Sequence, residues 1–501
     1  MTKVKSLLLG TAAGLVAVAG AQAADMPVKA KPVQYVKICT LYGDGYYYIP
    51  GSDICIKIGG YARADYGWNT KGARTPAYTG TQGAQDRTVA SYSTRHRANV
   101  QIDTRQQTAY GTLRTLESIH IQNEDNTFSF NVARAFIQWA GFTFGHAVSF
   151  ADGFNINDSW HYIQQQNSTD TGANGVNQIA YTFEFGNGVT LTFGADERRT
   201  KSITNLSFNG ALKVGSEPAN SYAGENWPDP HVDFRIDQAW GFFQLTGMAH
   251  DVRATYYSAS TSGACSTATT STNNQSTALT TCGHPADAVG WMVHVGGEVK
   301  LPMIAKGDRF GASFRYGQGA AGFAGGSNLS SPDLFASGNN VAVGWITDAV
   351  YINGSNLELT TAWSVAAGFE HYWTPALKTS LTGVYTQISY DATAKSYFAS
   401  NVCGTGSAGQ AGFSGGTLLT NCNPDWQFFQ GGIRTQWTPS PGFILGVNTA
   451  WTQVWTAFNG TTAVLTPNPV IGARPAGTYA INNQGIFSVM FRAQRNFNTG
   501  D

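Results

Sequence analysis

The chain has 501 residues, 31 Lys and Arg against 31 Asp and Glu, and 12% charged residues, about half of the ~25% usual in globular domains. The balanced charge argues against nucleic-acid binding, which needs a basic excess. Glycine (58 residues) and aromatic residues (13%) are abundant, and the chain beyond residue 23 has no run of the ~18–20 apolar residues that a membrane helix needs. The composition favours an exported, β-rich protein.

Residues 1–23 have the pattern of a secretory signal peptide. Two lysines precede a short apolar run, Leu7–Ala19, and Ala21–Ala23 forms a small-residue cleavage site. The apolar run is too short for a transmembrane anchor. We therefore predict export of a mature chain that begins near Ala24.

Six cysteines occur as three local pairs, separated by 16, 17 and 19 residues. Six cysteines allow fifteen connectivities, but short loops cost the least entropy to close, and an oxidising compartment permits disulfides. A metal site is disfavoured because the chain lacks C-x2-C spacing and nearby histidine pairs. The predicted disulfide cysteines are Cys39 and Cys55, Cys265 and Cys282, and Cys403 and Cys422.

From residue 54 onward, segments of about ten residues alternate polar and apolar side chains, as β-strands with two different faces do. In Thr94–Arg105, for example, Arg95 and Arg97 share one face and Val100 lies on the other. Sixteen strands are predicted in chain order: Ile54–Trp68, Ser93–Arg105, Thr108–Ile121, Phe130–Ala140, Phe142–Ser149, Asn177–Phe185, Val189–Arg199, His231–Gln238, Phe242–Thr255, Val289–Lys300, Asp308–Gly317, Thr360–Tyr372, Lys378–Tyr390, Trp426–Thr438, Phe443–Trp455 and Gln484–Phe497.

The connections between these strands alternate between long and short. The long ones are roughly 69–92, 122–129, 150–176, 200–230, 256–288, 318–359, 391–425 and 456–483. Outer-membrane barrels produce this alternation, with short periplasmic turns and long external loops. Such a sheet must close, because no unpaired edge can face hydrocarbon, and sixteen strands enclose an aqueous channel.

We therefore predict an all-β fold, a 16-stranded antiparallel transmembrane β-barrel over residues 54–497. An N-terminal periplasmic segment with a disulfide loop, 24–53, precedes the barrel, and a C-terminal extension, 498–501, follows it. One strand departs from the pattern, since Trp426, Phe428 and Arg434 fall on a single face.

Charged residues keep to one parity in the predicted strands. An Arg or Lys facing lipid would cost about 2–4 kcal/mol at mid-bilayer, so the charged face is expected to line the lumen. The predicted pore-lining residues are Arg63, Arg95, Arg97, Arg105, Arg114, Arg134, Asp103 and His146.

The connection 150–176 follows these arginines and carries acidic and aromatic residues. Folded into the barrel, its carboxylates would face the arginines, and the resulting transverse field would filter solutes. The alternative is that the connection lies outside and the arginines are simply solvated. The predicted constriction residues are Asp152, Asp158, Asp170 and Trp160.

The sequence has no H-E-x-x-H and no P-loop, and its nine histidines are scattered. We therefore predict no enzyme activity, no cofactor and no metal site.

Over nearly the whole chain the sequence resembles the general porins of α-proteobacteria, including rhizobial ones, and the match is most specific in six segments. The segments are Ala24–Val28, Tyr35–Gly60, Gly111–Arg114, Arg134–Phe150, Ala180–Thr192 and Val489–Phe497. The resemblance implies a trimeric outer-membrane pore with an inward-folded third external loop, and a first disulfide between Cys39 and Cys55. This chain has Gly145–His146 where the family often has Gly-Arg, and it continues past Phe497.

The predicted function is a porin of the outer membrane, passing small hydrophilic solutes and ions by passive diffusion. The expected partners are outer-membrane lipid, the permeating solutes, the outer-membrane assembly machinery and two further copies in a homotrimer. The alternatives are a channel that prefers sugars or anions, a structural or adhesive barrel acting through its loops, and an outer-membrane hydrolase.

Overall fold

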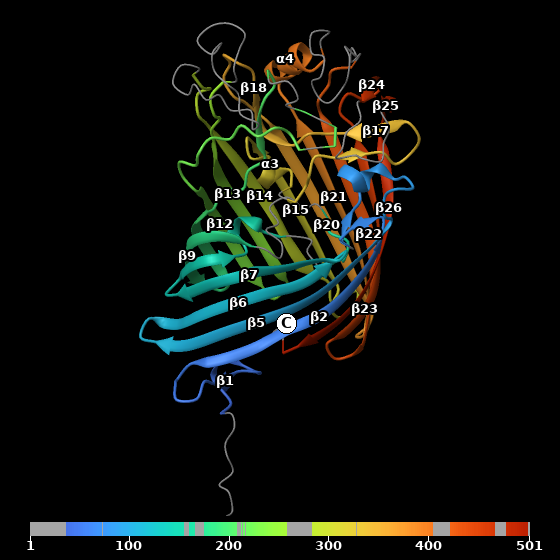
Figure 1. Ribbon diagram of the computed structural model, residues 1–501. Coiled ribbons are helices and arrows are strands. Elements are labelled where there is room, and N and C mark those ends of the chain that lie inside the picture. The colour runs from blue at the N-terminus through green and yellow to red at the C-terminus, as the bar shows by residue number, and fades with distance from the viewer. Residues whose placement is uncertain are drawn as a thin grey trace, which may run out of the picture. The chain divides into compact units, whose positions relative to one another are not determined.

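Long antiparallel strands dominate the computed structural model, which describes residues 37–72, 74–154, 160–165, 175–207, 212, 214–215, 217–257, 283–326, 328–403, 421–465 and 477–498 (Figure 1). The barrel strands are β2 (Cys55–Trp68), β5 (Tyr92–Thr108), β6 (Gly111–Glu124), β7 (Thr127–Trp139), β8 (Phe142–Ala147), β9 (Val176–Gly186), β10 (Val189–Asp196), β12 (Asp229–Gln238), β13 (Gly241–Val252), β14 (Ala288–Lys300), β15 (Arg309–Gln318), β20 (Thr361–Thr374), β21 (Leu377–Ser389), β22 (Trp426–Ser440), β23 (Phe443–Trp455) and β26 (Gln484–Phe497).

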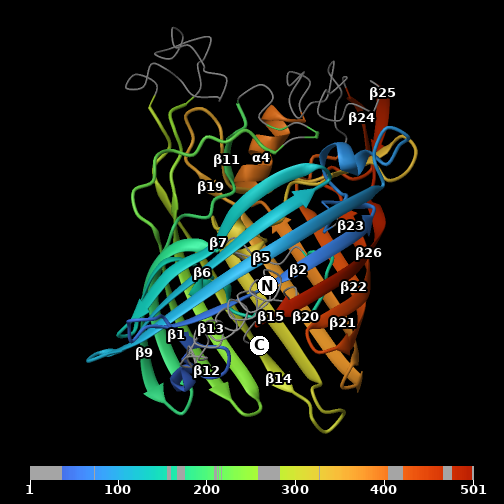
Figure 2. The ribbon, with the colours of Figure 1, turned by 60° about the horizontal axis from the view of Figure 1, so that its bottom comes forward.

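These sixteen strands close into a barrel. Each pairs antiparallel with its neighbour in sequence, and β2 pairs with β5 on one side and with β26 on the other. Figure 2 shows β2, β5, β6 and β7 side by side in the wall. A closed sheet leaves no unpaired edge for hydrocarbon, and the predicted sixteen-stranded barrel is confirmed. Within the described part of the chain, no helix is long and apolar enough to span a membrane.

Residues 37–56 belong to a separate unit that ends at Ile56. It contains η1 (Thr40–Tyr42) and β1 (Tyr47–Tyr48), and β1 pairs with Cys55 and Ile56. The Cys39–Cys55 disulfide joins the two ends of this hairpin, with the Cα atoms 6.0 Å apart. The predicted signal peptide lies outside the described residues.

Two-residue turns join several of the barrel strands. Asn187–Gly188 joins β9 to β10 with φ angles of 50° and 73°, as expected of the type I′ turn that Asn-Gly favours. The predicted long connection 122–129 is wrong, because Asp125 and Asn126 form an equally tight turn between β6 and β7, with φ angles of 47° and 67°. Their short polar side chains tolerate the left-handed region, so pairing continues further up both strands.

The loop end of the barrel carries structure that strand alternation does not predict. We name the loops by order: loop 1 (69–91), loop 3 (148–175), loop 4 (197–228), loop 6 (319–360), loop 7 (390–425) and loop 8 (456–483). Their elements are β3 (Thr70–Lys71), β4 (Thr75–Pro76), η2 (Gly80–Ala84), η3 (Phe150–Asp152), β11 (Ser202–Asn205), α3 (Ala321–Ala324), β16 (Asp333–Leu334), β17 (Asn340–Val343), β18 (Thr347–Tyr351), β19 (Glu358–Leu359), α4 (Ala392–Asn401), β24 (Thr461–Leu465) and β25 (Gly477–Ile481).

Strands from different loops pair with one another across this cap. In particular, β11 of loop 4 lies parallel to β18 of loop 6, and β17 of loop 6 lies parallel to β25 of loop 8. The Cys403–Cys422 disulfide closes loop 7, with the Cα atoms 6.1 Å apart. Cys265 and Cys282 lie outside the described residues.

A large apolar cluster, here called the cap core, joins these loops to the inner wall of the barrel. Its barrel members face inward near the loop ends of their strands: Met248, Met292, Ala362, Ile388, Trp426, Phe428, Val454 and Ile486. This accounts for the irregular strand. Trp426 and Phe428 of β22 face the cap core, whereas Arg434, further along the same face, meets a carboxylate.

Candidate functional site

The two faces of the barrel wall differ in polarity. Large apolar side chains are exposed on the outside, such as Leu245, Val365 and Val447, and residues directly opposite one another on paired strands share a face. Polar side chains such as Asp103, Gln244 and Ser380 point inward and are buried. The outside therefore suits lipid and the inside suits water and polar solutes.

Five of the six predicted arginines come from three adjacent strands, β5, β6 and β2, and the sixth, Arg134, is on β7. We call this inner surface the basic wall. Arg105 lies directly opposite Arg114, and Arg97 lies opposite Gln122. Arg134 lies opposite Ser118. All of these residues are on the inward face of the barrel wall.

At one end of the basic wall, Asp65 sits between two guanidinium groups. Arg492 Nε donates to Asp65 Oδ1 at 2.7 Å, and Arg95 Nε donates to Asp65 Oδ2 at 3.1 Å. All three side chains are at most 2% exposed. Arg95 is thus a buried partner of Asp65, and it presents little charge to the lumen.

Further along the wall, the arginines are more accessible. Asp103 accepts from Arg105 at 3.1 Å and from Arg114 at 2.8 Å, and both arginines remain more than a quarter exposed. Arg97 Nε donates to Gln122 at 2.7 Å, and Arg63 Nε donates to Gln494 at 2.6 Å. Because guanidinium groups outnumber carboxylates here, the basic wall presents a net positive surface.

His146 does not line the pore. It pairs with Ala135 on one side and with Asn177 on the other, and both of these face outward. Its Nδ1 is 2.8 Å from Asn177 Oδ1. The prediction is wrong because the Ala140–Gly141 turn fixes the parity of β8, which places Thr143 and Gly145 inward and His146 outward.

Loop 3 folds into the barrel, and its first part lies against the wall formed by β13 and β15. Gln244 Nε2 donates to the carbonyl of Phe150 at 3.1 Å. Arg315 Nη2 donates to the carbonyls of Asp152 and Phe154 at 2.7 and 3.1 Å. A Cβ added at inward-facing Gly311 would lie 2.1 Å from the Phe154 ring, so glycine makes room for this aromatic residue.

The second described part of loop 3, residues 160–165, continues across β20–β23. Asn448 Oδ1 accepts from the backbone N–H groups of Tyr162 and Ile163 at 2.7 and 2.8 Å. Gln165 Nε2 donates to Thr382 at 2.6 Å, and Gln164 N donates to the Arg74 carbonyl of loop 1 at 2.8 Å. The described residues 150–154 and 160–165 of loop 3 thus lie against the inner face of β13, β15 and β20–β23.

The carboxylate of Asp152 does not face the basic wall. It accepts from Arg199 Nη1 of loop 4 at 2.9 Å, and Asp152 is 1% exposed. Trp160 is also 1% exposed, and it lies under the Arg309 guanidinium, 4.2 Å from the ring centroid. Asp158 and Asp170 lie outside the described residues. For Asp152, the prediction of a carboxylate facing the arginines is wrong, because the start of loop 3 turns toward β15.

A second charged cluster, on the inner face of β15, β20, β21 and β22, was not among the predicted sites. Glu370 of β20 contacts Arg309 at 3.0 Å, Lys378 at 3.2 Å and Arg434 at 2.5 Å. Its carboxylate is fully buried. Sequence parity places these residues on the inner face, but only the pairing of β15, β20, β21 and β22 shows that the three cations converge on one acid.

A closed sixteen-stranded barrel with a polar lumen and an inward-folded third loop defines an outer-membrane channel fold. The family model described as the Porin subfamily matches residues 25–477, and the chain belongs to this family. It is a multi-pass β-barrel of the outer membrane.

Individual relatives match smaller parts of the chain. Porin Omp2b of Brucella melitensis biotype 1 is 35% identical over 214 residues, which cover 39% of this chain and 54% of the relative. Porin Omp2b of Brucella suis is 33% identical over 205 residues, 39% of this chain and 52% of the relative. The chain thus spans about half the length of these relatives.

Among solved structures, the outer membrane channel DcaP of Acinetobacter baumannii is similar in fold. The TM-score is 0.51 at 14% identity, over 90% of this chain and 99% of that chain.

Proposed function

We propose that this protein forms a water-filled channel for the passive diffusion of small hydrophilic solutes and ions. The observation that supports this most directly is the lumen itself, which contains the described parts of loop 3 and the partly exposed guanidinium groups of Arg105 and Arg114. Narrowing a polar channel to a charged waist selects solutes by size and polarity. No covalent chemistry or cofactor is part of the proposal.

Three copies of the chain are expected to assemble, and residues 24–53 are expected to lie in the periplasm. Both expectations rest on membership of the Porin subfamily. The assembly machinery of the outer membrane and the surrounding lipid are the other proposed partners.

Planar-bilayer conductance of the purified protein tests the proposed function. We expect ohmic current steps, grouped in threes if trimers insert. A correctly folded barrel that passes no current would contradict the channel and favour an adhesive role for the loops. Block by a single sugar at low concentration would favour a sugar-preferring channel instead.

A preference for anions is the second candidate, and it is favoured by the excess of guanidinium groups over carboxylates on the basic wall. Arg114 is the residue of choice for a test, because its side chain is 29% exposed. Under a salt gradient, Arg114→Gln should move the reversal potential toward cation preference. Lys395→Gln, on α4 of the cap, removes the same charge at a site 39% exposed and should leave the potential unchanged.

A further inference from the structure

Loop 6 lies deep in the cap core. Phe323 of α3, Leu334 of β16 and Phe335 are each 0% exposed, although a connection between barrel strands ordinarily runs over the surface. The fit is close. A Cβ added at Gly344 would lie 2.4 Å from the Trp426 ring, and one added at Gly325 would lie 2.8 Å from Ile388. Loop 6 therefore packs directly against the inner wall of the barrel.

A buried polar cluster anchors the base of loop 6. Asp348 Oδ1 accepts from Ala321 N at 2.7 Å, and Asp348 Oδ2 accepts from Lys201 N at 2.6 Å and from Tyr222 at 2.9 Å. His250 Nε2 of β13 lies 3.5 Å from the same oxygen, and its Nδ1 is 2.8 Å from Asp229 of β12. The carboxylate of Asp348 thus joins loop 6 to loop 4 and to the barrel.

The cap core covers only one sector of the barrel mouth. Its barrel members come from β13, β14, β20, β21, β22, β23 and β26. Among the described residues, none comes from β2, β5, β6 or β7, the strands of the basic wall. The described residues 150–154 and 160–165 of loop 3 contact β13, β15 and β20–β23 lower in the lumen.

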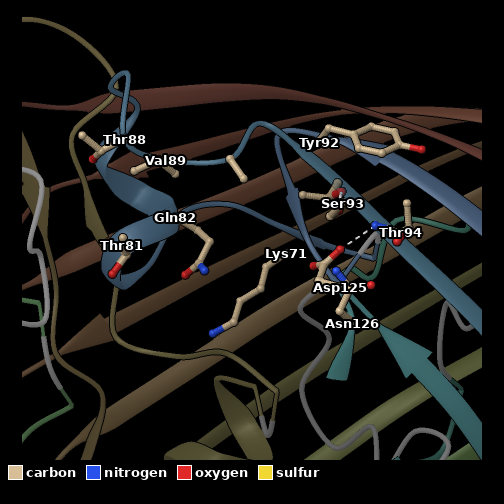
Figure 3. A pocket seen from close by; sticks show the side chains of 12 residues that line it. Lys71, Thr81, Gln82, Thr88, Val89, Tyr92, Ser93, Thr94, Asp125 and Asn126 are labelled. Carbon is tan, nitrogen blue, oxygen red and sulfur yellow. Dashed lines mark hydrogen bonds between the residues drawn. The ribbon is translucent and has the colours of Figure 1, made fainter. Parts of the chain in front are cut away.

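A polar cavity of about 540 Å³ lies above the basic wall, between loop 1 and the turn that joins β6 to β7. Its lining includes Lys71, Gln82, Ser93 and Asp125. The Lys71 side chain extends into the space between Gln82 and Asp125, whose carboxylate accepts from Thr94 N at 2.6 Å (Figure 3). The cavity borders the cap core at Val89, and the rest of its lining is mostly polar.

We propose that loop 6 is a stationary plug, which closes the mouth of the channel over β13–β26 and admits solutes only along the basic wall, past Lys71. The proposal rests on the channel function proposed above. A wild-type protein without conductance would refute that function, whereas the variants below test the plug in a protein that conducts.

The first test adds a charge to the buried part of loop 6. Leu334→Asp places a carboxylate in the cap core and should displace loop 6, raising single-channel conductance about twofold as the covered sector opens. Asn339→Asp adds the same charge at an exposed position of the same loop and should conduct like the wild type. Limited proteolysis reports whether loop 6 has moved. Displacement without a rise in conductance would overturn the plug.

The second test locks loop 6 in place. A Cβ added at Gly325 would lie 3.2 Å from Ala362 Cβ on β20, near the ~3.5–4.5 Å that a disulfide needs. The Gly325→Cys, Ala362→Cys pair should conduct equally when oxidised and reduced. Lower conductance in the oxidised form would show that loop 6 leaves the mouth to open the channel, and would overturn a stationary plug.

The third test concerns the entrance. After Lys71→Cys, coupling a bulky thiol reagent should remove most of the current. Ala399→Cys, exposed on α4, provides the matched control and should keep full current after the same reaction. Full current through the modified Lys71→Cys channel would show that solutes do not enter past Lys71.

Discussion

Single charged residues inside this barrel are held by specific partners, and the partners determine what each charge can do. Asp65 illustrates this, because it holds Arg95 and Arg492 in a buried group, whereas Asp103 holds two arginines that remain partly exposed. The first arrangement stabilises the wall, and the second leaves charge available to solutes.

Asp65→Asn should destabilise the folded barrel by about 3–5 kcal/mol, because it leaves two buried guanidinium groups without their carboxylate. Asp103→Asn is the matched control, and it should cost about 1 kcal/mol or less because its partners are solvated. Urea-dependent unfolding in lipid vesicles measures both. Equal losses would show that burial of the Asp65 group does not matter.

The buried carboxyl group of Asp333 in loop 6 should make the stability of the cap depend on pH. Burial raises the pKa of its carboxyl group to about 8, and nearby Glu217 acts in the same direction. A hydrogen bond from Gly80 N of loop 1 and the positive charge of Lys71 both act to lower this pKa. An unfolded aspartate ionises near pH 4. The contact of loop 1 with loop 6 should therefore be most stable below about pH 4 and weaken as the pH rises to about 8.

Hydrogen exchange of the peptides that cover 74–90 and 328–345 measures this effect, after correction for the intrinsic pH dependence of exchange. Asp333→Asn should abolish the additional loss of protection. Asp287→Asn, at a site 46% exposed, should keep the wild-type response. Persistence of the pH response in Asp333→Asn would assign it to another group.

The barrel strands have an apolar outer face, which suits insertion into the membrane, and a largely polar inner face, which lines the lumen. Leu245 of β13 is 48% exposed, and its direct neighbours Phe234 and Val295 share its outward face. On the inner face, Gly311 and Gly446 have no side chain, and this leaves room for the aromatic residues of loop 3.

Leu245→Arg should cost about 2–4 kcal/mol of folding free energy in a bilayer, because the guanidinium group would face hydrocarbon. Gln101→Arg, on the inward face of β5, should cost much less. Folding yields in vesicles of defined lipid compare the two variants. If Leu245→Arg left the folding free energy unchanged, this face of β13 would not contact lipid.

The whole barrel depends on the pairing of its first and last strands. Residues Gly60–Trp68 of β2 pair with Val489–Phe497 of β26, and Asn498 donates to the Ile58 carbonyl at 2.7 Å. Without β26, both β2 and β23 would present unpaired backbone groups to lipid.

Truncation after Asn483 should therefore abolish the folded, heat-modifiable form in gels. Truncation after Asn498 keeps every pair of this seam and should fold like the full chain. A folded product from the shorter protein would show that the barrel can close without β26.

The sequence alone determined the barrel, because strand alternation is local and the bilayer penalises a charge on the wrong face. It predicted all sixteen strands, and it placed Arg97, Arg105 and Arg114 on the inner face. It failed for His146, where a two-residue turn reset the parity, and for the tight turn at Asp125–Asn126. Only the tertiary structure decided that Trp426 and Phe428 face a cap core, that Asp152 binds Arg199 and that three cations meet at Glu370. These contacts join residues far apart in the chain, and no local periodicity encodes such neighbours.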